Sequence, residues 1–137
     1  MKMLKKAASL ALASAMVFSL AACGSNGGGS DEGNSDATTF KIGGIGPITG
    51  DTAIYGTAVQ NGIQLAVDEI NADGGINGYQ IEYKFEDDQS DSEKSVNAYN
   101  TLKDWGMQML VGTVTSTPCT AVVEETHADN MFQLTPS

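Results

Sequence analysis

The sequence predicts an α/β fold, a parallel sheet with helices on both faces. Two observations support this prediction. Short segments with apolar residues at every second position alternate with longer segments in which apolar residues recur every three or four positions, as in strands and helices. This strand–helix order repeats through four strands, and strands joined by helical crossovers lie parallel with right-handed connections. Ligands of such sheets bind beyond the carboxyl ends of the strands.

The first strand is expected at residues 40–45, before the turn residues Gly46-Pro47. A helix follows from about Tyr55. Its apolar face has helical spacing and is widened by three further residues, giving Val59, Ile63, Val67 and Ile70 together with Ala58, Leu65 and Ala66. Asn71 and the glycine pair Gly74-Gly75 are expected to end this helix and form a tight turn.

Residues 79–85 alternate strictly and predict a second strand. One face of this strand should carry Tyr79, Ile81, Tyr83 and Phe85. Ser90 or Asp91 can cap the second helix. The buried side of that helix is expected to consist of Val96, Tyr99, Leu102 and Trp105.

Residues 107–112 predict a third strand, apolar enough to be buried on both faces. A third helix is expected over residues 117–130, although its amphipathic pattern is weak. A fourth strand is expected over residues 131–134.

Residues 1–22 are typical of a lipoprotein signal peptide. A lysine-rich start precedes an apolar run over residues 7–20, which is short for a membrane span. The tetrapeptide Leu20-Ala21-Ala22-Cys23 resembles a lipobox, so Cys23 is the expected lipidation site and new N-terminus. The alternatives are a plain secretory signal with an incidental cysteine and an uncleaved anchor.

Residues 23–39 are rich in glycine, serine, asparagine and acidic residues, and predict a flexible linker. The folded part is then residues 40–137. This organisation predicts a protein outside the cytoplasm, attached to the bacterial cell membrane through its lipid anchor only.

Charge excludes nucleic acid as a partner. Of the seven basic residues, all lysines, three lie in the signal peptide, which leaves four against 17 acidic residues. An acidic surface repels phosphate backbones, and the four lysines are scattered.

Five motifs follow one another along the folded part. They are the loop Gly46–Gly56, the stretch Gly62–Gly78 around Leu65-Ala66-Val67-Asp68-Glu69-Ile70-Asn71, the pair Asp87-Asp88, Leu110-Val111-Gly112 with Ser116, and Leu134-Thr135-Pro136. Together they resemble leucine/isoleucine/valine-type periplasmic binding proteins, the solute-binding components of ABC transporters for branched-chain amino acids. The resemblance covers about residues 40–137 and implies the N-terminal lobe of a type I periplasmic binding protein, incomplete here.

Ser116 and Thr117 lie between the third strand and the third helix, at the expected ligand-binding edge. The free N–H groups and the positive dipole end of a helix N-terminus suit a carboxylate. Ser116 could instead only cap the helix, and the two roles can coexist.

The resemblance adds four further ligand-binding candidates. It implies that Tyr55 covers the apolar part of an amino acid, the alternative being packing against the loop. Thr115 is a weaker candidate. Pro136 and Ser137 lie where the next ligand-contacting loop of the family begins.

Family members are more than twice as long as this chain and close two lobes about a hinge on the ligand. In the family, the acidic group that pairs with the ligand's ammonium comes from the second lobe. This polypeptide alone is therefore expected to bind amino acids very weakly or not at all, and to leave an open strand edge and exposed apolar surface. The resemblance implies permease subunits of an ABC transporter as partners.

The same residues fit two alternative functions: a sensory ligand-binding domain of this fold, and a binding protein for amides, urea or aromatic acids. An enzyme is not expected, because the glycines of Gly44-Ile45-Gly46 do not continue into a dinucleotide fingerprint and no catalytic constellation is present. Asp87-Asp88, His127 and Cys119 are expected to be structural, with no metal and no cofactor.

Overall fold

The computed structural model describes residues 39–137, so the expected signal peptide, Cys23 and residues 23–38 of the expected linker lie outside the described residues. The elements are β1 (Thr39–Gly46), α2 (Ala53–Ala72), β2 (Gln80–Asp87), α3 (Ser92–Asp104), β3 (Met109–Gly112), α4 (Ser116–Ala128) and β4 (Phe132–Leu134). Thr39, expected in the linker, is therefore the first residue of β1.

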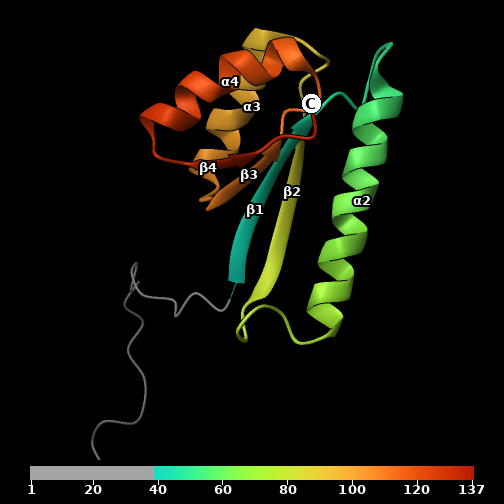
Figure 1. Cartoon of the computed structure of the whole chain (residues 1–137), viewed down its shortest axis with the longest axis vertical. Coiled ribbons are helices and arrows are strands. Elements are labelled where there is room, and N and C mark those ends of the chain that lie inside the picture. Colours follow the sequence, from blue (N-terminus) through green and yellow to red (C-terminus); the bar gives the residue numbers. More distant parts are fainter. Residues whose placement is uncertain (1–38) are drawn as a thin grey trace, which may run out of the picture. The chain divides into compact units, whose positions relative to one another are not determined.

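The sheet is parallel throughout and has the order β2-β1-β3-β4. The chain moves from β1 to β2 in one direction, and then crosses back over β1 to β3 and on to β4. Right-handed crossovers therefore place α2 on one face and α3 with α4 on the other. Figure 1 shows this arrangement, with α2 on one side of the strands and α3 beside α4 on the opposite side.

The helix α2 packs mainly on β1 and β2. Val67 is buried, and the predicted core positions Val59, Ile63 and Ile70 are half-buried. The prediction that further residues widen this face is wrong: Leu65 is 61% exposed, and the remaining two, Ala58 and Ala66, are exposed as well. The buried stripe of α2 is therefore narrower than the sequence indicates.

The end of α2 is tied to the edge strand β2. Gly74 and Gly75 adopt the positive φ angles of 98° and 81° that let the chain leave the helix. The Asn71 side chain also forms two hydrogen bonds with the backbone of β2. Its amide donates to the Ile81 carbonyl at 2.8 Å and its oxygen accepts from the Ile81 N–H at 2.7 Å.

The core lies between the sheet and the helices α3 and α4. Its buried members are Ile45, Ala98, Tyr99, Leu102, Met107, Leu110 and Val122. Two predicted core residues, Val96 in α3 and Trp105 directly after it, are only half-buried. Asp91 is the residue that caps α3, through a bond from the Lys94 N–H to its carboxylate at 2.9 Å.

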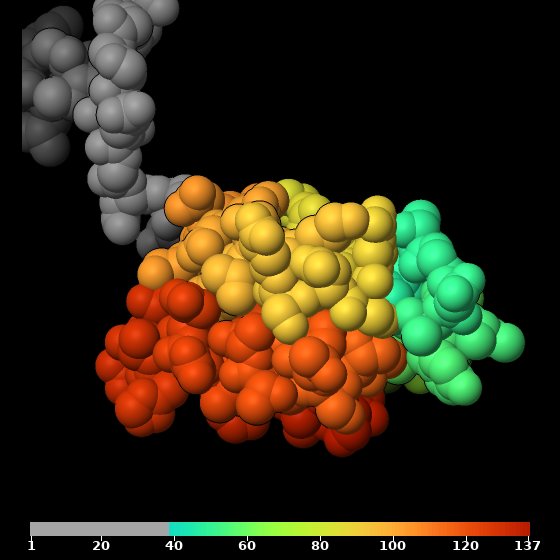
Figure 2. All heavy atoms as spheres, turned by 90° about the horizontal axis from the view of Figure 1, so that it is seen from above, coloured from blue at the N-terminus to red at the C-terminus, as the bar shows by residue number. Residues whose placement is uncertain are grey.

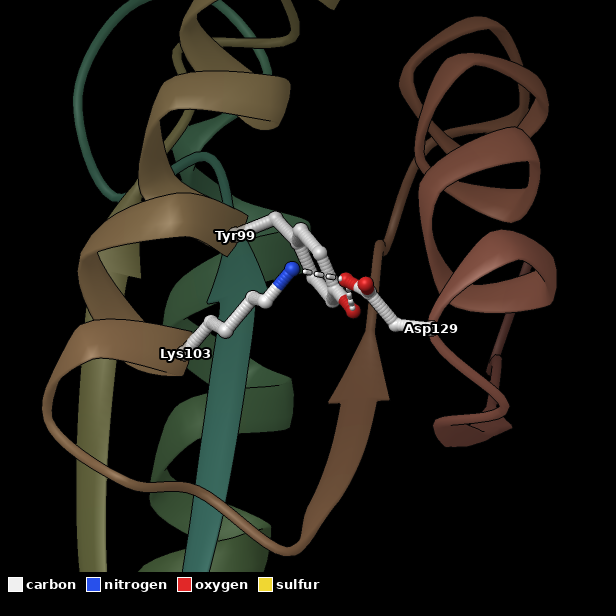
Figure 3. Close-up of polar contacts among 3 residues, drawn as sticks. All are labelled: Tyr99, Lys103 and Asp129. Atoms are coloured by element: carbon white, nitrogen blue, oxygen red, sulfur yellow. Dashed lines mark hydrogen bonds and ion pairs between the residues drawn. The ribbon is translucent and has the colours of Figure 1, made fainter.

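A polar contact joins α3 and α4 near their C-terminal ends (Figure 3). Tyr99 and Lys103 project from α3 toward Asp129, which follows the last residue of α4. The Tyr99 hydroxyl and the Lys103 ammonium both bind Oδ2 of Asp129.

Two expectations for the strands are wrong. Tyr79 lies outside β2, in a turn where it bridges to Ile76, and it is half-exposed. β3 is not buried on both faces: Leu110 is buried against the helices, whereas Met109 and Val111 are half-buried because α2 packs mainly on β1 and β2.

The outer strand β4 exposes much of its apolar surface. Phe132 is 63% and Leu134 54% exposed, while Gln133 between them donates to the Gly112 carbonyl at 2.7 Å. The open edge and exposed apolar surface expected from the sequence are therefore present in the described part of the chain.

Candidate functional site

The strand order reverses between β1 and β3, the point at which parallel sheets of this kind bind ligands. The loops that follow the carboxyl ends of β1, β2 and β3 meet at this edge. Figure 2 looks onto it and shows the start of α2 (teal to green), α3 (yellow) and α4 (orange) side by side.

The loop after β1 is held by a carboxylate from β2. Asp87 accepts from the Ile48 N–H at 2.9 Å and from the Thr49 hydroxyl at 2.5 Å. Burial alone would raise the pKa of Asp87, but these bonds and one from the Gln89 N–H outweigh it and lower the pKa. Asp87 is therefore a charged anchor for the loop that precedes Tyr55.

The same loop packs closely against the first turns of α2. Gly56 is buried, and a Cβ placed on it would lie 1.8 Å from the Pro47 carbonyl oxygen. Only a glycine allows this approach of helix to loop.

Asp88 has a different role from its neighbour. It is fully buried, accepts from the Ser90 N–H at 2.9 Å and lies 3.1 Å from the donating Ser95 hydroxyl. Burial raises its pKa more than these bonds lower it. Asp87 and Asp88 both have structural hydrogen bonds: Asp87 binds the loop after β1, and the buried Asp88 binds the turn into α3 and the first turn of that helix.

Hydroxyl groups from three loops converge next to these carboxylates. The Ser90 hydroxyl lies 2.6 Å from the Thr52 hydroxyl and accepts from the Thr115 hydroxyl at 3.4 Å. Thr52 and Ser90 belong to the loops after β1 and β2, which the sequence indicated, but no sequence signal singled out their contact. The sequence indicates Ser90 only as a candidate helix cap.

The segment after β3 presents three of the predicted site residues. Thr115 is the residue that precedes α4 and is half-buried, while Ser116 and Thr117 are its exposed first two residues. The position of Ser116 inside the helix rules out the alternative that it is the cap residue. The α4 N-terminus begins here, one residue earlier than predicted.

The predicted residues at the end of the chain meet α4. The Ser137 hydroxyl lies 2.8 Å from the Ser116 hydroxyl, and the Ser137 N–H donates to the Thr135 hydroxyl at 3.1 Å. Pro136 is exposed. The structure therefore brings Ser116 and Ser137 together.

Tyr55 stands apart from these residues. It lies in the first turn of α2 and is 63% exposed. Within residues 39–137 no hydrogen bond links its side chain to Thr115, Ser116 or Ser137.

The remaining candidates lie away from this edge or have ordinary surroundings. His127 is exposed in the last turn of α4, and Cys119 is half-buried in the first turn, where its sulfur lies 3.8 Å from the Gln133 amide nitrogen. Over residues 39–137 no group of three histidine, cysteine, aspartate or glutamate side chains could hold a metal ion. No helix in this described range is long and apolar enough to cross a membrane.

The whole described region is similar to known proteins. Residues 39–137 match the periplasmic binding protein family model. The Leu/Ile/Val-binding protein BraC3 of Rhizobium johnstonii is 38% identical over 98 residues, which are 72% of this chain and 27% of the relative. The leucine-, isoleucine-, valine-, threonine- and alanine-binding protein of Pseudomonas aeruginosa is 36% identical over 104 residues, 74% of this chain and 27% of that protein.

Solved structures share the fold. The branched-chain amino acid transporter substrate-binding protein LivJ of Streptococcus pneumoniae, in complex with isoleucine, superposes with a TM-score of 0.69 at 39% identity, covering 72% of this chain and 29% of LivJ. A fatty acid ABC transporter substrate-binding protein of Thermomonospora curvata gives a TM-score of 0.65 at 28% identity over 72% of this chain and 25% of its own.

The chain spans about a quarter of the length of the curated relatives that it matches. The matched part carries the parallel sheet and flanking helices of the type I periplasmic binding protein fold. Proteins of this kind bind solutes and are not enzymes. The chain belongs to the periplasmic binding protein family.

Proposed function

We propose that this chain is part of an extracytoplasmic, lipid-anchored substrate-binding component of an ABC transporter for branched-chain amino acids. The observation that carries the proposal is the 38–39% identity, over nearly the whole described region, to a Leu/Ile/Val-binding protein and to an isoleucine-bound transporter component. The partners are then the amino acid and the permease subunits of the transporter.

The start of α4 is the proposed carboxylate subsite. The first N–H groups of a helix lack partners within the helix and lie at the positive end of its dipole. Ser116 adds an exposed hydroxyl, flanked by Thr115 and Thr117. Tyr55, exposed on α2, would cover the apolar side chain of the ligand, and Pro136 with Ser137 would line the adjacent wall.

Ligand binding is tested on the native protein purified from its own cells, titrated by calorimetry with leucine, isoleucine and valine. Micromolar or tighter binding of at least one of them is expected. A long-chain fatty acid serves as the comparison ligand, because a relative at 28% identity belongs to a fatty acid transporter. Binding of the fatty acid with no response to the three amino acids would contradict the proposed ligand.

We further propose that residues 1–22 are a signal peptide, that Cys23 carries the lipid and that residues 23–38 tether the domain. The support is the order of charged, apolar and lipobox residues in the sequence. Cells that express the protein incorporate labelled palmitate into it, and Cys23→Ala abolishes the label. Cys119→Ala, at the second cysteine of the chain, keeps it. Equal labelling of the two variants would contradict the anchor.

A further inference from the structure

Ser90 stands at the turn from β2 into α3 and touches the two loops on either side of it. Its hydroxyl lies 2.6 Å from the Thr52 hydroxyl and accepts a bond of 3.4 Å from Thr115. A serine hydroxyl can accept and donate at the same time, so the bond from Thr115 is compatible with a bond of either direction to Thr52. Loops that lie 38 and 25 residues away in the sequence are thereby connected through one side chain.

The turn itself does not explain a serine at this position. Ser90 has a φ of 58° and follows Gln89 with a φ of 51°, a backbone region that glycine adopts at no steric cost. The Ser90 N–H is already satisfied by Asp88, and that bond needs no side chain on residue 90. What the serine adds over a glycine is the hydroxyl and its two contacts.

Both contacts lead to residues proposed to touch the ligand. Thr52 accepts the N–H of Tyr55 at 3.0 Å through its carbonyl, at the start of α2. Thr115 precedes Ser116 directly, and its carbonyl accepts the N–H of Cys119 in the first turn of α4 at 3.0 Å. The position of Ser90 thus bears on both the Tyr55 side and the Ser116 side of the site.

We propose that Ser90 is a positioning residue of the ligand site. It sets the distance between the loop after β1 and the N-terminus of α4 without touching the ligand itself. The effect of Ser90 on ligand affinity rests on the proposed amino-acid binding function. The connection between the loops does not, because it consists of hydrogen bonds within this chain.

Amide hydrogen exchange on the purified protein measures the connection directly. Ser90→Ala keeps a Cβ on the turn and removes only the hydroxyl. Exchange of the Tyr55 and Cys119 amides is expected to accelerate about fivefold, the effect of one lost hydrogen bond, while the Leu110 amide in the core is unchanged. Gln89→Ala is the matched control, since Gln89 has the same backbone conformation and its side chain contacts Lys94 instead.

A second variant separates the bond from the turn. Thr52→Val removes the partner hydroxyl and leaves residue 90 untouched. If the connection acts through this bond, Thr52→Val accelerates exchange of the Tyr55 amide as much as Ser90→Ala does. The exchange rate of this amide in the double variant is then the same as in either single variant. Unchanged Tyr55 and Cys119 amides in Ser90→Ala, or an equal acceleration at Leu110, would overturn the proposal.

The effect on ligand binding is measured on the native protein that carries the same substitutions. Ser90→Ala is expected to weaken leucine binding about fivefold with an unchanged melting temperature, and Gln89→Ala to leave both unchanged. Unaltered affinity in Ser90→Ala overturns positioning. A native protein that binds none of the branched-chain amino acids overturns the proposed function instead, and the exchange rates then decide the role of Ser90 by themselves.

Discussion

The Tyr99 hydroxyl on α3 donates a hydrogen bond of 2.8 Å to Oδ2 of Asp129, the residue that follows α4 (Figure 3). Lys103 Nζ lies 2.5 Å from the same oxygen. A carboxylate at the negative end of a helix dipole is unfavourable by itself. Lys103 and Tyr99 offset this repulsion, so a carboxylate that would weaken the end of α4 joins α4 to α3 instead.

This contact predicts a specific dependence of stability on pH. The hydrogen bond from Lys103, and then that from Tyr99, lower the pKa of Asp129 below its ordinary value. The folded state therefore binds this proton less readily than the unfolded state does, and the stabilisation is present above the ordinary aspartate pKa and is lost as pH falls through the lowered pKa. Between pH 5 and pH 3, roughly the range of aspartate titration, the free energy of unfolding of Asp129→Asn should therefore fall less than that of the wild type. Urea denaturation at each pH measures both.

Asp104→Asn is the matched control, because Asp104 is exposed at the end of α3 and its side chain has no hydrogen-bond partner within residues 39–137. Its pH profile should follow the wild type. Parallel profiles for Asp129→Asn and the wild type would contradict the role of the contact.

Tyr99 predicts the opposite dependence at alkaline pH. Burial, followed by the bond to Asp129, raises the pKa of Tyr99 above its ordinary value of 10.0. The stabilisation from the protonated phenol is complete below that ordinary value and decreases as pH rises above it. Between pH 8 and pH 11, roughly the range of tyrosine titration, the melting temperature of Tyr99→Phe should therefore fall less than that of the wild type. Thermal melts measure this difference. An identical alkaline slope in the two proteins would refute this assignment.

Gly56 and Gly62 should respond in opposite ways to the same substitution. Gly56→Ala forces a methyl group against the Pro47 carbonyl and should destabilise the protein by about 3 kcal/mol. Gly62 lies in the same helix with nothing within 4 Å of its missing Cβ, so Gly62→Ala should stabilise it by about 1 kcal/mol. Chemical denaturation measures both, and two changes of the same sign would disprove the close approach of α2 to the loop.

Asn71→Ala removes both bonds to Ile81 and leaves the N–H and the carbonyl of a buried residue without them. We expect a loss of about 2 kcal/mol in the free energy of unfolding. Asn61→Ala on the exposed side of α2 is the control and should change stability by less than about 0.5 kcal/mol. Equal effects of the two substitutions would show that the helix end does not depend on the bridge to β2.

Ser116→Ala tests the proposed carboxylate subsite. A hydrogen bond to a charged group contributes about 1.5–3 kcal/mol, so leucine affinity of the native protein should fall by about ten- to hundredfold in calorimetric titration. Stability should hardly change, because the side chain is exposed and bonds only Ser137. Thr101→Ala, whose hydroxyl bonds only its own helix, should keep full affinity. Unaltered affinity in Ser116→Ala would remove this residue from the site.

The fold was predictable because its signals are local. Strict alternation located β2 and helical spacing located α2, and the order of elements then left a parallel sheet as the simplest solution. The exposed Leu65 was mispredicted because apolarity does not tell which side of a helix another element covers. The half-exposure of Val111 in β3 has the same origin, since it depends on how far α2 extends over the sheet.

The site was predictable only in part. Position after a strand pointed to Ser116 and resemblance to Ser137, and the structure joins the two. The hydrogen bond from the Ile48 N–H to Asp87 joins residues that are 39 positions apart. It depends on the register between β1 and β2, which no local pattern encodes. The contact of Ser90 with Thr52 is invisible in the sequence for the same reason.

The bridge between Asn71 and Ile81 also bears on self-association. β2 forms one outer edge of the sheet, and the unpaired backbone groups of such an edge are a template on which other chains can add strands. The Asn71 amide occupies both groups of Ile81 and acts as a stop that an incoming strand would have to displace. A strand that added at Ile81 would have to break both hydrogen bonds to Asn71, so this part of β2 resists strand addition by a second copy of the chain.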